Sequence, residues 1–200
     1  MAKLIKDKAI VEINFVDYPY GCVRYNLRFL YGDKPLINPE LLVEDPFSFD
    51  EYEKDSLIPF LKRLLKDDAN DVWQSLEPEM RIEAVFSPKM GLKEVENDPS
   101  VIYISDDQRE RYRRVDEERK KAGGKLPEDN FIFRFFVQEA KLKPFHESGE
   151  SGYGEFVPAM QLWVSRKELE DFVVQLKQDY EEWKVRNKEQ IAYCWGEVNL

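Results

Sequence analysis

The sequence is poor in the residues on which most nucleophilic and metal chemistry depends. Its 200 residues include a single histidine, His146, and two cysteines, Cys22 and Cys194, which lie far apart and form no CxxC pair. Such cysteine usage favours reduced thiols and a cytoplasmic protein over a secreted, disulfide-stapled one. With one imidazole, Ser-His-Asp and Cys-His constellations can be built only around His146.

His146 lies in a glycine-rich stretch, KPFHESGESGYGEF, at residues 143–156. The candidate nucleophiles Ser148 and Ser151 sit in the same stretch, where nothing locks their side chains as nucleophilic catalysis requires. No G-x-S-x-G elbow is formed, because these glycines do not follow a strand and open a helix. We interpret the stretch as a hairpin connection and keep a hydrolase that uses His146 only as a less favoured alternative.

Motifs for metals, phosphates and membranes are also missing. His146, Glu147 and Glu150 are fewer ligands than a closed zinc site needs, and no acidic stretch has the spacing of an EF-hand loop. Neither G-x-x-x-x-G-K-[ST] nor a G-x-G-x-x-G after a strand occurs. No apolar run approaches the roughly 20 residues of a membrane span, and the start of the sequence lacks the apolar region of a signal peptide. We therefore expect no metal, no cofactor and no membrane contact.

Charge of one sign is in excess. The sequence has 40 acidic and 30 basic residues, for a net charge of −10. This charge repels phosphate backbones, so we expect no nucleic-acid partner. It attracts a basic protein partner and speeds the encounter, although it also serves solubility alone. We predict partner binding by the acids that precede the first helix and by three residues of the glycine-rich stretch: Asp50, Glu51, Glu53, Asp55, Glu147, Glu150 and Tyr153.

Alternation of apolar and polar residues predicts strands with one buried face. Pro19 and Gly21 separate the first two of these stretches and predict a hairpin turn. Ile132 and Phe136 break the alternation of the most aromatic stretch, which suggests that a helix covers part of its other side. Trp73 falls outside every stripe, so we expect it at the surface. We predict six strands in all, at residues 9–18, 22–31, 77–87, 100–105, 130–143 and 155–165, of which 100–105 is a short apolar run bounded by Pro99 and Asp106.

Helical spacing marks two amphipathic helices. Ser56 is a plausible N-cap of the first, which places Pro59 in its first turn; a start near Phe49 would instead make Pro59 a kink. Ser165 and Glu168 form the S-x-x-E capping box of the second, whose apolar residues then follow a 3, 4, 7 spacing. Both helices have an apolar stripe for packing.

Residues 106–125 form a charged run with almost no apolar stripe. Acids and bases interleave in it at the (i, i+3) and (i, i+4) spacings of an exposed helix, which favours a solvated insertion over a nucleic-acid contact.

The last ten residues are apolar for a terminus, so we expect them to dock. A regulatory or adaptor domain that self-associates through Tyr193 and Trp195 is the main alternative function.

Short turns between most strands imply an antiparallel arrangement with helices on one side. We predict an α+β fold with one antiparallel sheet of about six strands, two main helices packed on one face, and a charged helical insertion at residues 106–125. No repeat or linker divides the sequence, so residues 1–200 are expected to form a single domain.

The order of these elements, together with the stretches Glu44–Asp68, Leu76–Ser87 and Leu162–Trp183, resembles the WapI-type immunity proteins of bacterial polymorphic toxin systems. The resemblance implies a small acidic cytoplasmic protein that binds and neutralises a cognate toxin domain, often a nuclease, and has no enzymatic activity of its own. The charged insertion and the tail after Lys188 match nothing in that family. No residue inherits a role from the resemblance.

Overall fold

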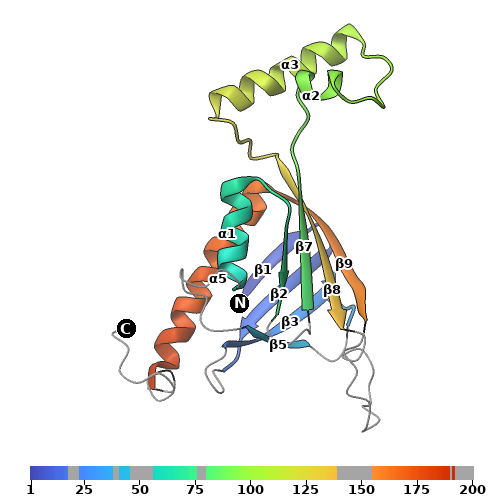
Figure 1. The fold of residues 1–200 in the computed structure, drawn as a ribbon. Coiled ribbons are helices and arrows are strands. Elements are labelled where there is room, and N and C mark those ends of the chain that lie inside the picture. The colour runs from blue at the N-terminus through green and yellow to red at the C-terminus, as the bar shows by residue number, and fades with distance from the viewer. Residues whose placement is uncertain are drawn as a thin grey trace.

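The computed structural model describes residues 1–17, 23–37, 41–45, 56–75, 80–138, 155–189 and 191. In these ranges the chain forms two antiparallel sheets and four helices, as Figure 1 shows. The predicted α+β class is confirmed. The prediction of one sheet of about six strands is wrong, because the strands divide between a sheet of five and a sheet of four.

The first sheet contains the predicted hairpin. Residues of its second and third strands pair antiparallel, from Ala9 with Tyr31 to Phe15 with Tyr25. The first and fifth strands were not predicted, because each is only five residues long and shows little alternation. The strands are β1 (Ala2–Lys6), β2 (Ala9–Phe15), β3 (Val23–Tyr31), β4 (Lys34–Pro35) and β5 (Leu41–Asp45).

The second sheet has the order β6-β7-β8-β9. The prediction of a surface position for Trp73 is wrong: its residue is only 3% exposed, because it lies on β6 opposite Ile82. Ile132 pairs with Trp163, which is 50% exposed, so this side of the sheet faces solvent and not the predicted helix. The strands are β6 (Asp71–Gln74), β7 (Met80–Ser87), β8 (Asn130–Gln138) and β9 (Phe156–Ser165).

Both predicted amphipathic helices are confirmed. The first begins directly after Ser56, so Pro59 does lie in the first turn, where its missing N–H costs least. At the start of the last helix the Ser165 hydroxyl accepts from the Glu168 amide at 3.2 Å, and the Glu168 carboxylate accepts from the Ser165 amide at 2.7 Å. The helices are α1 (Leu57–Asp67), α2 (Leu92–Glu96), α3 (Asp106–Lys121) and α5 (Arg166–Arg186).

One core lies between the inner faces of the two sheets and the helices α1 and α5. Phe29 of β3 and Phe135 of β8 meet edge-to-face with ring centroids 5.5 Å apart, which joins the sheets. Phe15 of β2 lies 5.7 Å from Tyr180 and 6.1 Å from Trp183, which joins the first sheet to α5. Large rings that each bury roughly 150–250 Å² thus supply much of the core.

Arg166, the first residue of α5, is buried at the junction of three elements. Its Nη1 donates to the Leu65 carbonyl at 3.0 Å, and its Nη2 donates to the Asp68 carboxylate at the end of α1. The same guanidinium lies over the rings of Phe131 and Phe86, at 5.5 and 5.8 Å from their centroids. One buried cation therefore fixes the end of α1 against the second sheet and the start of α5.

The capping carboxylate of α5 makes stability depend on pH. Burial raises the pKa of Glu168, but hydrogen bonds from Ser165 and the ammonium of Lys6 outweigh burial, so the pKa lies below its ordinary value. A carboxylate whose pKa is lowered by folding contributes stability above its unfolded pKa of about 4.3 and loses it as the pH falls through the folded pKa. We expect the Glu168→Gln variant to lose less stability than the wild type in that acid range.

Urea unfolding at a series of pH values measures this difference. Glu170→Gln, on the exposed side of the same turn, is the matched control and should follow the wild-type curve. Parallel curves for the wild type and Glu168→Gln would show that the cap makes no pH-dependent contribution.

Candidate partner-binding arm

The charged insertion is one part of a larger excursion between β7 and β8. Ser87 and Asn130 are a cross-strand pair, and the residues between them, 88–129, leave and rejoin the sheet at that pair. We call residues 88–129 the arm; Figure 1 shows it beyond the ends of β7 and β8, away from the core. The prediction of an insertion at 106–125 is therefore correct in kind but too short, because it omits α2.

The helix α3 is the exposed helix that the charge pattern predicts. Val115 is its one buried residue. Glu110 pairs with Arg113 at 4.0 Å and with Arg114 at 3.4 Å, at the expected (i, i+3) and (i, i+4) spacings. Such exposed pairs contribute little stability, so the arm depends on contacts elsewhere.

The base of the arm is fixed by Asp129, which is 1% exposed. Its carboxylate accepts from the amides of Lys89 and Leu126, each at 3.0 Å. It also pairs with Arg119 of α3 at 3.4 Å, and its carbonyl accepts from the amide of Arg166 at 2.7 Å. One buried residue thus joins both ends of the arm to α3 and to the start of α5.

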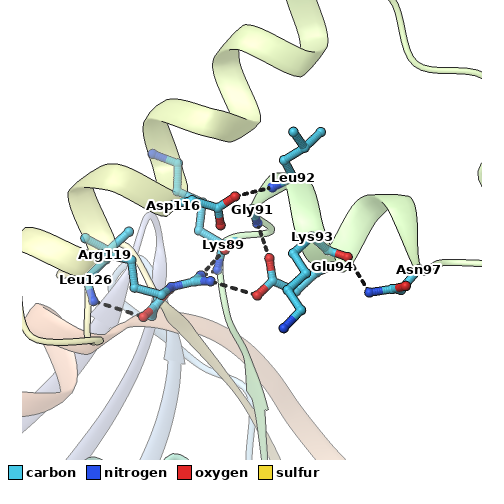
Figure 2. A network of polar contacts seen from close by, with 10 residues as sticks. Lys89, Gly91, Leu92, Lys93, Glu94, Asn97, Asp116, Arg119 and Leu126 are labelled. Carbon is cyan, nitrogen blue, oxygen red and sulfur yellow. Dashed lines mark hydrogen bonds and ion pairs between the residues drawn. The ribbon is translucent and has the colours of Figure 1, made fainter.

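Polar contacts also hold α2 against α3, as Figure 2 shows. The Asp116 carboxylate accepts from the Leu92 amide at 2.9 Å. The Glu94 carboxylate accepts from the Gly91 amide at 2.8 Å and from Arg119 at 3.2 Å. A Cβ at Gly91 would lie 1.8 Å from an Asp116 oxygen, so a side chain there would displace that carboxylate. The two helices form one ordered unit.

The loop between α2 and α3 corrects another prediction. Residues 100–105, SVIYIS, are predicted as a short strand bounded by Pro99 and Asp106, but the structure shows irregular backbone there. No strand of the described chain lies beside the loop, because the arm carries it away from both sheets. As a result Ile102 is 99% exposed and Tyr103 is 80% exposed.

This loop has a defined shape although its apolar residues are exposed. The Asp98 carboxylate accepts from the Ser100 amide at 2.8 Å and from the Ser100 hydroxyl at 2.6 Å. These hydrogen bonds hold the pKa of Asp98 below its ordinary value. The loop and the adjoining helix ends enclose a hollow of about 430 Å³, lined by Val95, Glu96, Val101, Ile102, Tyr103, Ile104, Asp106 and Arg109.

Negative charge surrounds the exposed pair Ile102 and Tyr103. The stretch from residue 94 to 107 holds five acids and no lysine or arginine. Arg109 follows it and pairs with Glu96 at 2.7 Å. We call residues 97–107 the arm tip. It combines two exposed apolar side chains with an acidic setting, and sequence reasoning missed it because the short apolar run was predicted as a strand.

The predicted partner-binding residues lie outside the described ranges, so the structure does not place them. The same is true of the predicted catalytic candidates, both cysteines and the aromatic tail. The partner-binding set is Asp50, Glu51, Glu53, Asp55, Glu147, Glu150 and Tyr153; the others are Cys22, His146, Ser148, Ser151, Tyr193, Cys194 and Trp195.

Other kinds of site receive no support within the described ranges. No three His, Cys, Asp or Glu side chains of those ranges gather in a way that could hold a metal ion. No helix in them is both long and apolar enough to cross a bilayer. A second hollow, of about 580 Å³, lies between β2 and α5, and is lined by Met1, Asn14, Phe15, Asp179, Glu182, Val185 and Arg186.

No protein-family model matches the sequence, and comparisons with curated proteins and with solved structures found no significant match. The resemblance to WapI-type immunity proteins therefore stays a prediction. The arm tip is the feature of the described chain on which a functional proposal can be built.

Proposed function

We propose that this protein is a non-enzymatic inhibitor that binds a basic protein, in the way an immunity protein binds its cognate toxin domain. The observation that carries the proposal is the arm tip, where Ile102 and Tyr103 are exposed among acids on an ordered support. Apolar side chains that stay in water at such a place mark a protein-binding surface.

The chemistry of the arm tip defines the partner. Burial of Ile102 in an apolar pocket would contribute roughly 1.5–3 kcal/mol. The three acids of the arm tip, Asp98, Asp106 and Asp107, fit lysines and arginines at the rim of that pocket, and they would speed association through long-range attraction. A nuclease, whose phosphate-binding cleft is basic, has this character. Because Asp129 already fixes the arm, little ordering has to accompany binding.

Replacing Ile102 by aspartate should weaken binding to the toxin domain roughly 10- to 100-fold, because an apolar anchor becomes a charge that must be buried. The partner for this measurement is the product of the gene immediately upstream, which is tested first for toxicity, and titration calorimetry gives the affinity. Val185→Asp is the matched control, because Val185 is 77% exposed on α5, far from the arm in sequence.

Two outcomes would contradict the proposal. One is a neighbouring gene product that is harmless to cells, or whose toxicity persists when this protein is co-expressed. The other is equal affinity of the wild type and the Ile102→Asp variant.

Association should also slow as salt rises, since exposed charges are screened within about 8 Å at physiological ionic strength.

A further inference from the structure

The solvent side of the second sheet carries a second exposed apolar surface, which the arm does not explain. Trp163 on the edge strand β9 is 50% exposed, and Val72 on the opposite edge strand β6 is 51% exposed. We call this side of the sheet the outer face. Its apolar residues come from all four strands: Val72, Val85, Ile132, Phe136, Pro158 and Trp163.

The two central strands of the outer face present complementary cross-strand pairs. Val85 of β7 pairs with Ile132 of β8, so one pair is apolar. Glu83 lies beside Arg134, with an oxygen-to-nitrogen distance of 3.9 Å. The third pair is Arg81 and Phe136, where the guanidinium lies over the ring at 5.9 Å from its centroid.

We propose that the outer face binds the same face of a second copy of this chain, about a two-fold axis that runs along the strands between β7 and β8. This axis places β7 of one copy over β8 of the other copy. Each residue therefore contacts, in the second copy, the counterpart of its own cross-strand partner. Val85 meets Ile132 of the second copy, and Glu83 meets Arg134 of the second copy. Isologous contact requires this kind of self-complementarity.

The same axis accounts for the edges of the face. It places β9 of one copy over β6 of the other, which brings the half-exposed Trp163 toward Val72 of the second copy. Two sheets that pack face to face lie about 10 Å apart, and a tryptophan side chain fills that gap. Tryptophan is among the side chains that most often supply a large share of the binding energy of an interface.

Charge explains why a copy can approach here in spite of the net charge of −10. Most surfaces of so acidic a chain repel one another, but the outer face carries Arg81 and Arg134 against Glu83. Glu83 pairs with Arg81 at 2.6 Å and with Arg134 at 3.9 Å. Two such faces meet without contact between uncompensated like charges.

Sedimentation velocity over about 1 to 100 µM protomer tests the association, because a dimer's population depends on protomer concentration. We expect the wild type to reach twice the monomer mass. Trp163→Glu should raise the dimer dissociation constant at least about tenfold, whereas Val185→Glu, on α5, should leave it unchanged. Circular dichroism checks that each variant is folded.

A pair of charge reversals tests the axis itself. Glu83→Arg alone opposes two cations across the axis, and Arg134→Glu alone opposes two anions, so each variant should stay monomeric. A mixture of the two variants opposes unlike charges at both positions and should form dimers again. In the mixture each chain still carries like charges at its own positions 83 and 134. Recovery of the dimer therefore cannot come from a change within one chain.

Three results would overturn the proposal: a wild type that is monomeric at the highest concentration, a Trp163→Glu variant as dimeric as the wild type, or a mixture that stays monomeric. Binding of the toxin domain by the arm tip is measured separately and does not depend on these results.

Discussion

Replacing Arg166 by leucine should lower the free energy of unfolding by about 2–4 kcal/mol, because the two hydrogen bonds that its buried guanidinium donates are lost. Leucine keeps apolar bulk against the rings of Phe86 and Phe131 but cannot donate hydrogen bonds. The carbonyl of Leu65 and the carboxylate of Asp68 then keep only the ammonium of Lys125, which lies 3.0 Å from the carbonyl and 3.3 Å from the carboxylate. Urea unfolding followed by tryptophan fluorescence measures the loss.

An exposed arginine provides the control for this prediction. The Arg113 side chain is 59% exposed and makes only a weak pair with Glu110, so Arg113→Leu should change stability by less than about 0.5 kcal/mol. If Arg166→Leu is as mild as Arg113→Leu, Arg166 is not the link that fixes the end of α1.

Replacing Asp129 by alanine should detach the arm from the sheets. The amides of Lys89 and Leu126 would lose their acceptor, and an unsatisfied buried donor such as the Leu126 amide costs about 1–3 kcal/mol, more than the part-buried Lys89 amide. We therefore expect a total loss of about 2–4 kcal/mol. Hydrogen exchange at residues 88–129 should quicken more than exchange in β8 or α5, because the body keeps its own core.

Glu94→Ala is the control for Asp129→Ala, because Glu94 also bonds Arg119 but lies on α2, whose contacts are mainly within the arm. It should loosen α2 alone. If hydrogen exchange in Asp129→Ala becomes faster by the same factor throughout the chain, the arm and the body unfold together. Unchanged exchange in the arm would mean that Asp129 does not fix it.

The sequence predicted the long elements because each has a pattern that needs no knowledge of its neighbours. The Ser165 and Glu168 capping box marked the start of α5 correctly, and alternation marked β2, β3, β7, β8 and β9. The strands that were missed are short. For β1 and β6, five and four residues give too few alternations to distinguish a strand from a loop.

The division into two sheets could not be predicted from the same patterns. Alternation shows that one face of a strand is buried, but it does not show what covers that face. The alternation around Phe29 and Phe135 is equally compatible with two positions on one face of a single sheet and with two positions that face each other on different sheets. In the structure they face each other across the core, at 5.5 Å between centroids.

The candidate site was missed for a related reason. The prediction relied on local density of acids, which selected residues 50–55 and 147–153. Exposure of apolar residues is a property of the fold, and Ile102 and Tyr103 look like buried strand residues until the chain is seen to leave the sheet. The same holds for Trp163, whose alternation predicts a strand but not an uncovered side.

Ser87 and Asn130 stand opposite each other in the ladder, so the two strands beneath the arm keep their register whatever connects them. The connecting segment can therefore lengthen, shorten or be exchanged by recombination with only local adjustment at the junction. If target recognition resides in that segment, descendants of one ancestral scaffold can acquire new targets rapidly while their cores change slowly. A graft of residues 88–129 between two distant homologues would transfer target choice along with it.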